Sequence, residues 1–306
     1  MKTITNKELS QFQPKTKEPV VRHINDSMSE TFALMDTDPQ KLSGVPTKYW
    51  KLFNKAFGGL RSELIVLTAD TGCGKSSFAR NWLQDCVHQN IPSLLISLEE
   101  DITQVNLRLF QMELGKTHDK MTFEDRGLVG RCLEQYPLYY LDWGDGYLPD
   151  EMLFKTIGYA HEKFQTQFIV VDHLDYIKSS QNSPNESYRL ADIVRRLARI
   201  AHTLKITILL IVHPSKTGKK GFDHNDSREI NIDELKGTSS IKQEADAVIT
   251  LFRRKDGSNQ TYLRFQKIRN HLYAKYDQSK IKFQFDDQNC RFLECVNDQI
   301  TYGEIS

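Results

Sequence analysis

The residues best suited to chemistry follow an apolar run at residues 63–69. They form the string Ala69, Asp70, Thr71, Gly72, Cys73, Gly74, Lys75, Ser76 and Ser77, which has the spacing of a phosphate-binding loop with alanine in place of the first glycine. The glycines let backbone N–H groups face phosphate oxygens, and a helix expected to follow adds the positive end of its dipole. Lys75 would reach the β- and γ-phosphates, and the Ser76 hydroxyl would bind Mg²⁺. The string therefore predicts a site for ATP and Mg²⁺.

Two further buried runs end in carboxylates. Asp172 follows the apolar residues 168–171, where a phosphate-loop ATPase places the second ligand of its metal ion. An acid in this place could instead cap the next helix. Glu99 and Glu100 follow the run at 93–97, and either carboxylate could orient the attacking water. Because strand alternation points them to opposite faces, only one can face the phosphate, and the residues alone leave that choice open.

Basic and small polar residues supply further candidates. His213 ends the run at 207–212, where it could contact a phosphate or simply be a satisfied polar residue at a strand end. Lys267 and Arg269 fall on one side of a predicted strand, a pattern that is usually solvated charge. The loop Lys236, Gly237, Thr238 and Ser239 could give N–H donors to a nucleic-acid backbone or cap a helix as an exposed loop.

The elements that must position these residues alternate between short apolar runs and helical stretches. The runs lie at 63–69, 93–99, 138–143, 167–175 and 207–214. This rhythm predicts an α/β fold with a mostly parallel sheet covered by helices on both faces. After residue 246 strands follow one another without helices, which predicts antiparallel strands added to the sheet. We expect one ATPase domain at 43–306 and, at 1–42, an arm with one short amphipathic helix.

Composition sets limits on function. The chain has 306 residues and a formal net charge of +1, so a nucleic-acid-binding surface must concentrate its basic residues locally. The sequence shows neither a membrane-spanning run nor the apolar core of a signal peptide. The 5 cysteines form no Cys-x-x-Cys pair, which argues against a zinc ribbon or a disulfide framework. A cytoplasmic protein with no membrane partner is the expectation.

Several strings together resemble the ATPase domain of DnaB-type replicative helicases. They are SLEE followed by TQVNLRL, the approach GVPTKYWKLFNKAFGGLRSELIVL, the strand VVDHLDYI and the segment IVHPSK, within residues 43–294. The histidine of IVHPSK is closer to Twinkle-like helicases than to bacterial DnaB proteins. The resemblance implies a RecA-like core in which Glu99 is the general base and His213 senses the γ-phosphate.

The same resemblance implies roles for the remaining candidates. Lys267 and Arg269 would reach the nucleotide of a neighbouring subunit, although the residues after Arg269 lack the glycines common in the family. Arg253 and Phe285 would hold the adenine ring, and residues 236–239 would contact DNA phosphates. A homo-hexameric ring is implied, moving 5′→3′ along single-stranded DNA beside a separate primase or loader. The alternatives are a RecA- or KaiC-like ATPase that binds DNA or regulates without unwinding, and a non-catalytic adaptor.

Overall fold

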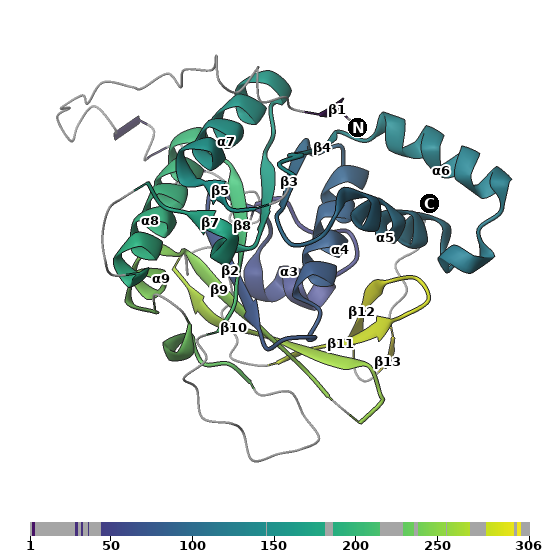
Figure 1. Ribbon diagram of the computed structural model, residues 1–306. Helices are drawn as coiled ribbons and strands as arrows, with labels where there is room; N and C mark the ends of the chain where they lie inside the picture. The colour runs from purple at the N-terminus through teal and green to yellow at the C-terminus, as the bar shows by residue number, and fades with distance from the viewer. Residues whose placement is uncertain are drawn as a thin grey trace.

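A computed structural model describes most of the chain (Figure 1). The described residues are 2–3, 28–29, 32, 36, 44–144, 146–180, 186–214, 229–235, 238–254, 256–269, 280–296 and 299–300. In this part of the chain a large sheet has the strand order β1-β4-β3-β6-β8-β2-β9-β10-β11-β12-β13. The strands are β1 (Lys2–Thr3), β2 (Leu64–Ala69), β3 (Ser93–Ser97), β4 (Leu138–Tyr140), β6 (Phe168–Asp172), β8 (Thr207–Val212), β9 (Ala247–Arg253), β10 (Gln260–Ile268), β11 (Ile281–Asp286), β12 (Arg291–Val296) and β13 (Gln299–Ile300), with a separate small pair of β5 (Leu148–Pro149) and β7 (Ile177–Lys178).

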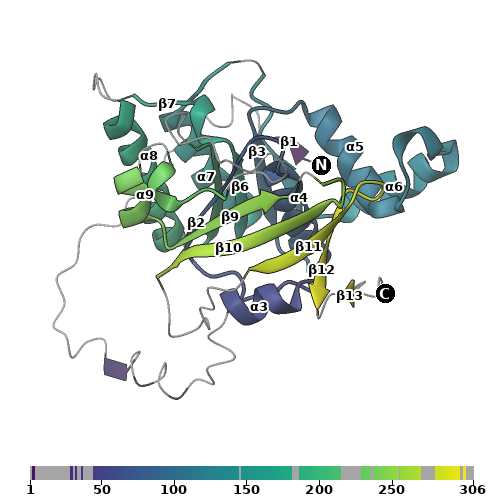
Figure 2. The same cartoon turned by 90° about the horizontal axis from the view of Figure 1, so that it is seen from below.

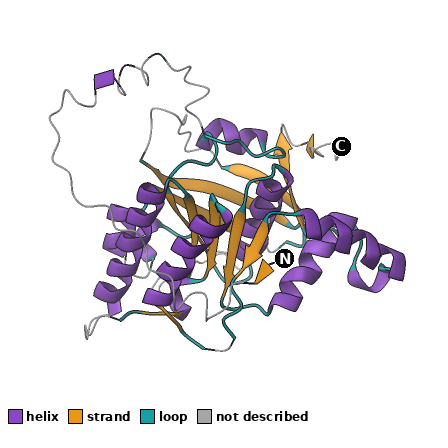
Figure 3. Cartoon of the chain, turned by 90° about the horizontal axis from the view of Figure 1, so that it is seen from above, coloured by secondary structure: helices purple, strands orange, loops and turns teal. Residues whose placement is uncertain are grey.

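Helices connect these strands and cover both faces of the sheet, as Figure 3 shows. They are α3 (Lys51–Phe57), α4 (Lys75–His88), α5 (Ile102–Leu114), α6 (Phe123–Gln135), α7 (Asp150–Phe164), α8 (Glu186–Leu204) and α9 (Thr238–Glu244), with short 3₁₀ turns η2 (His118–Lys120), η3 (Leu174–Tyr176) and η4 (Ile232–Glu234). The predicted α/β fold with C-terminal antiparallel strands is confirmed.

One detail of the expected topology was wrong. The strands from β1 to β2 are parallel, and β10 to β13 are antiparallel, as expected. Strand β9, however, pairs parallel with β2 and antiparallel with β10. The reason is that α9 returns the chain to the edge where β2 begins, so β9 is the last parallel strand. Figure 2 shows β9 leading into the antiparallel group.

Strand alternation divides the core between the two faces. Ile65 and Leu67 of β2 pack with α3, α4 and α5, in a cluster rich in aromatic rings such as Phe78 and Trp82. Leu64 and Val66 of the same strand pack on the other face with α7, α8 and α9. Near-continuous apolar runs are typical of parallel strands that are buried on both sides.

Helix α3 is fixed to the sheet through its amino end. Its own N-cap residue, Trp50, provides no side-chain cap. Instead the buried Glu294 of β12 accepts hydrogen bonds from the backbone N–H groups of Leu52 (2.7 Å) and Phe53 (2.9 Å). The Trp50 ring N–H donates to the Phe292 carbonyl at 3.0 Å. These contacts tie the C-terminal strands to the helix before β2, and so stabilise the sheet next to the phosphate loop.

The predicted N-terminal arm lies mostly outside the described residues. Lys2–Thr3 of this segment pair with Tyr139 and Tyr140 of β4, so the first residues extend the edge of the sheet. Of the predicted amphipathic helix, Met28 and Phe32 are described, and both are helical and exposed. Within the described residues, no helix has the length and apolar character that a membrane crossing requires.

Candidate nucleotide site

The register of the parallel strands brings the predicted site residues to one edge of the sheet. Ser97 at the end of β3 pairs with Asp172 at the end of β6, and Thr68 of β2 pairs with Val212 at the end of β8. The segments that follow these strands therefore meet. They line a cavity of about 290 Å³ with residues 71–77, Glu99, His213, Arg253 and Phe285, all of them predicted, together with Arg80, Glu100, Thr261 and Phe292.

The phosphate loop has the expected shape between β2 and α4. Gly72 and Gly74 have φ angles of 79° and 89°, in the left-handed region that glycine adopts without strain. A Cβ at Gly74 would also lie 3.0 Å from Cζ of Phe292. The Lys75 ammonium is folded over the loop and donates to the carbonyls of Ala69 (3.0 Å) and Asp70 (3.3 Å). Burial lowers the pKa of Lys75, while Cys73, Asp172 and Glu99 act to raise it.

Asp172 has the surroundings of a cation ligand. Its side chain is buried, and among the described residues its Oδ1 atom has no hydrogen-bond partner. Burial raises the pKa of Asp172 to about 6, while the Ser76 hydroxyl and the Arg80 charge act to lower it. A buried acceptor with an unused oxygen beside a hydroxyl fits Mg²⁺, which prefers oxygen ligands. Ser76 and Asp172 are thus suited to hold the metal ion of a Mg²⁺–nucleotide complex.

The two adjacent glutamates are separated by their partners. Glu100 forms an ion pair with Arg80 of α4. Glu99 instead turns toward His173, whose Nε2 lies 3.5 Å from its Oε2. The His173 ring contacts the His213 ring edge to face, with 4.3 Å between centroids. This arrangement favours Glu99 as the base, in agreement with the choice that the resemblance implied.

Glu99, His173 and His213 also form a group that could hold a metal ion, because ligand atoms from all three lie within 4.8 Å of one another. Burial lowers the pKa of His173, and the nearby His213 acts in the same direction. Neutral imidazoles beside a carboxylate can either bind a transition metal or share hydrogen bonds.

Arg253 and Phe285 lie together on the wall of the cavity. The Arg253 guanidinium carbon is 5.6 Å from the Phe285 ring centroid, and Phe285 packs against Phe292. A cation over an aromatic ring, next to the phosphate loop, is suited to contact a planar base.

Lys267 and Arg269 lie at the opposite edge of the sheet. Ile268 of β10 pairs with Ala247 of β9, which pairs with Ile65 near the start of β2, whereas the phosphate loop follows the end of β2. Four residue steps of strand, roughly 13 Å, separate these levels. Lys267 donates to the carbonyls of Lys242 and Ala245, and Arg269 donates to the Gln243 carbonyl.

Both side chains therefore bind the carboxyl end of α9, where helix carbonyls lack partners within the helix. Arg269 also forms an ion pair with Asp246 at 3.3 Å. Of the predicted DNA loop, Lys236 and Gly237 lie outside the described residues, and Thr238 and Ser239 form the first turn of α9. The structure thus does not bring Lys267 and Arg269 together with the phosphate loop of the same chain.

Comparison with known proteins places this chain. The DnaB-like helicase C terminal domain family matches residues 44–294. The chain belongs to this family. Replicative DNA helicase DnaB of Buchnera aphidicola subsp. Baizongia pistaciae is 27% identical over 230 residues, 72% of this chain and 49% of that protein. The same enzyme of Pasteurella multocida is 25% identical over 222 residues, 69% of this chain and 47% of that protein. The chain thus spans about half the length of the curated relatives it matches.

Solved structures agree on the fold of this DnaB-like domain. A helicase ATPase domain superposes with a TM-score of 0.72 at 15% identity, covering 88% of this chain and 98% of that one. A DnaB-like replicative helicase, described together with its interactions with primase, gives a TM-score of 0.70 at 15% identity, covering 89% of this chain and 67% of that one. The predicted RecA-like core is confirmed.

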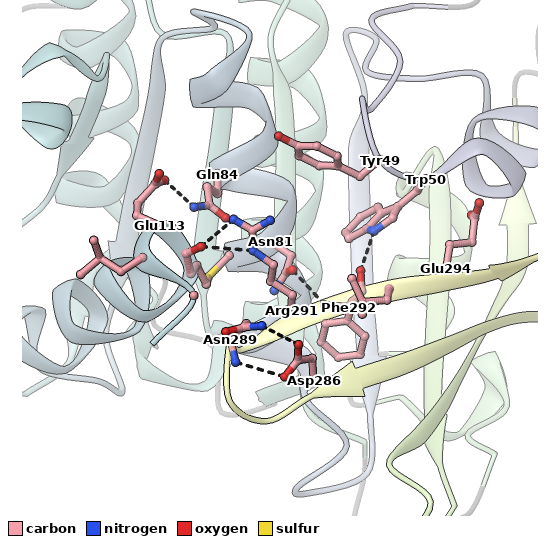
Figure 4. A pocket seen from close by; sticks show the side chains of 14 residues that line it. Tyr49, Trp50, Asn81, Gln84, Glu113, Asp286, Asn289, Arg291, Phe292 and Glu294 are labelled. Atoms are coloured by element: carbon pink, nitrogen blue, oxygen red, sulfur yellow. Dashed lines mark hydrogen bonds between the residues drawn. The ribbon is translucent and has the colours of Figure 1, made fainter. Parts of the chain in front are cut away.

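A second cavity, of about 360 Å³, lies on the other side of α4 (Figure 4). Its polar side chains pair with one another: Gln84 with Glu113, and Asn289 with Asp286 at 2.7 Å. Phe292 lines this cavity and the nucleotide cavity alike. The DnaB-like domain therefore has its largest cavity away from the phosphate loop, and the chemistry belongs to the smaller one.

The sequence analysis missed four residues of the site. Arg80 follows the phosphate loop by one turn of α4, and His173 directly follows Asp172, so both had a signal in their spacing. Phe292 and Thr261 come from β12 and β10, and nothing local in the sequence links them to the loop.

Proposed function

We propose that this chain is the motor domain of an ATP-driven DNA helicase that forms a ring and moves along single-stranded DNA. The observation that carries the proposal is the meeting of Lys75, Ser76, Glu99, Asp172 and His213 at one edge of the sheet. These residues supply phosphate binding, metal binding, a base and a γ-phosphate contact in one cavity. Family membership favours helicase activity over a regulatory ATPase of similar fold.

Each residue has a definite task in ATP hydrolysis. The loop N–H groups and Lys75 bind the phosphates, and Ser76 with Asp172 hold Mg²⁺. The bound metal ion would offset negative charge on the phosphates. Glu99 accepts a proton from the attacking water, and His213 contacts the γ-phosphate oxygens. Arg253 and Phe285 hold the base, which fixes the nucleotide along the cavity.

Lys267 and Arg269 act on the nucleotide of the next subunit. Their position at the far edge of the sheet supports this proposal, because they cannot reach the phosphate loop of their own chain. An arginine supplied by a neighbour stabilises charge in the transition state and makes hydrolysis depend on assembly. The assembly proposed is a homo-hexamer.

The same two side chains connect hydrolysis to DNA. In the single subunit they bind the carboxyl end of α9, and α9 begins at the loop 236–239 proposed to contact DNA phosphates. Reaching a neighbour's nucleotide requires them to leave these carbonyls, so the end of α9 changes its partners with each engagement. Movement from 5′ to 3′, a separate primase or loader, and a cytoplasmic location complete the proposal.

The test measures the ATPase rate against protein concentration, with and without single-stranded DNA. The wild type should show cooperative, DNA-stimulated turnover, and Arg269→Ala should lose roughly 10³-fold or more. Mixing Arg269→Ala with Glu99→Gln should restore activity, because a mixed interface combines an intact base with an intact arginine. Unwinding of a fork with a 5′ tail then tests the motor itself.

Arg195→Ala is a matched control, since Arg195 is exposed and pairs with Glu244 on the α8–α9 surface. It should hydrolyse ATP like the wild type. Turnover that is independent of concentration, of DNA and of Arg269 would refute the ring motor and favour a monomeric ATPase.

A further inference from the structure

We propose that His173 is a positioning residue for the attack on ATP, with its Nε2–H donating to the Glu99 carboxylate and holding it toward the γ-phosphate. The inference rests on the proposed function and adds to it a residue that acts through the base. Three features of the structure carry it: the hydrogen bond at Nδ1, the confinement of the ring, and the exposure of Glu99.

The hydrogen bond at Nδ1 decides where the proton of His173 lies. The backbone N–H of Asp175 donates to Nδ1 at 3.3 Å. A backbone N–H can only donate, so Nδ1 must be the accepting nitrogen. A neutral imidazole has one proton, which therefore lies on Nε2. This is the nitrogen that faces Oε2 of Glu99, at 3.5 Å.

The ring of His173 is held from two sides. It is 5% exposed and begins the 3₁₀ turn η3. The Tyr176 ring lies 4.8 Å from it and the His213 ring 4.3 Å, both edge to face. A buried ring between two other rings has few rotamers to choose from. His173 is therefore a rigid donor.

Glu99 is the opposite case. Its side chain is 47% exposed, whereas the neighbouring Glu100 is engaged by Arg80. A glutamate in contact with water has three rotatable bonds and loses entropy when held in one geometry. A fixed donor beside it restricts that freedom. The separation of 3.5 Å is longer than a normal hydrogen bond, as is common for catalytic groups before substrate binds, and a small rotation of Glu99 closes it.

The position of the Nε2 proton also distinguishes this role from metal binding. A metal ion at Nε2 requires that nitrogen to be unprotonated, which would move the proton to Nδ1 and against the Asp175 N–H. The local backbone thus favours a hydrogen-bonded Glu99–His173 pair over a metal centre. Since His173 contacts both Glu99 and His213, it also fixes the base relative to the proposed γ-phosphate sensor.

Two substitutions separate the nitrogens of the ring. His173→Gln places an amide N–H near the position of Nε2, and His173→Asn places its amide near Nδ1 and has no group that reaches Glu99. We expect His173→Asn to lower kcat roughly ten- to hundredfold with KM little changed. His173→Gln should recover a large part of that loss. Thermal melting and binding of a non-hydrolysable ATP analogue, measured in the DNA-stimulated full chain, should be alike in the two variants.

A double-mutant cycle with Glu99→Gln shows whether His173 acts through the base. In single-turnover hydrolysis, His173→Asn should lower the residual rate of Glu99→Gln by no more than about twofold, because the group it positions is already gone. An equal loss in both backgrounds, an equal loss in the Gln and Asn variants, or an unchanged kcat would overturn the inference and leave the proposed function standing. Unchanged turnover in Glu99→Gln alone would overturn both.

Discussion

Replacing Asp172 by asparagine should raise the stability of the empty protein while removing its ATPase activity. The change keeps the size of the side chain and removes the charge. Asp172 is buried, its Oδ1 has no partner among the described residues, and its pKa rises to about 6 from 3.8. At about 1.4 kcal/mol per pH unit, that rise corresponds to a penalty of about 3 kcal/mol for the ionised carboxylate.

The sign of the pH dependence follows from the direction of this shift. The folded protein binds the proton more readily than the unfolded chain, so the charged carboxylate lowers stability above pH 6. That penalty disappears as the pH falls from about 6 toward 3.8. An asparagine amide with incomplete partners offsets about 1–2 kcal/mol of the gain. The expected net increase at pH 7.5 is about 1–2 kcal/mol, or roughly 2–4 °C in Tm per kcal/mol.

The assay is unfolding by urea and by heat in the presence of EDTA, at pH 7.5 and at pH 5. Asp172→Asn should be more stable than the wild type at pH 7.5, and the difference should shrink at pH 5. Addition of Mg²⁺ with a non-hydrolysable ATP analogue should reverse the order. Ligand at a hundredfold excess over its Kd stabilises a binding-competent protein by about 2.7 kcal/mol, and the variant lacks one metal ligand.

Asp119→Asn provides the matched control, because Asp119 is an exposed carboxylate on η2. It should respond to neither pH nor ligand in this way. The reasoning would be refuted if Asp172→Asn proved less stable than the wild type in EDTA at pH 7.5, or if its difference from the wild type did not change between the two pH values.

Two further predictions concern the surroundings of the site. Gly74→Ala should lower the free energy of unfolding by roughly 1–2 kcal/mol and weaken ATP binding, because φ is 89° and the new Cβ would meet Phe292. Urea unfolding compared with Gly130→Ala, where no atom lies within 4 Å of the new Cβ, measures this, and equal effects would contradict it. Glu294→Ala should cost roughly 2–5 kcal/mol, since it leaves two N–H groups at the start of α3 without their acceptor. Glu294→Gln keeps an acceptor and should cost less, so similar losses in calorimetry would show that the cap has no such role.

The parts of the fold that the sequence predicted are those set by local pattern. The strands that end at Ala69 and Asp172 are continuous apolar runs, and the loop after Ala69 has glycines where positive φ angles occur. Parallel pairing then brings the ends of these strands to one edge without further information. The choice between Glu99 and Glu100 needed the fold, because it depends on Arg80 and His173, which come from other elements.

Other features depend on contacts between distant parts of the chain. Glu294 caps a helix that begins 243 residues earlier in the sequence, at Lys51, and no local pattern marks it as a cap. Phe292 reaches the phosphate loop through the pairing of β11 with β12. Helices α5 and α6 were not predicted either: α6 buries only Val129, so its sequence has a weak apolar face.

Two buried aspartates at opposite edges of the sheet show why one edge is the reactive one. Asp246 and Asp172 are both 5% exposed. Asp246 accepts hydrogen bonds from the Leu64 N–H at 2.9 Å, from His202 at 2.8 Å and from Arg269 at 3.3 Å. Such a carboxylate is satisfied by the fold itself.

Asp172, in contrast, keeps one buried oxygen without a partner among the described residues, next to a lysine that folds back onto its own loop. A charge that is buried and incompletely paired lowers stability and is retained where a ligand completes it. The edge that carries Asp172, Lys75 and the strained glycine positions is therefore prepared for a charged ligand. At the other edge Arg269 already has a carboxylate, which it must exchange for a neighbour's phosphate, so the difference between these two partners sets how strongly assembly can drive hydrolysis.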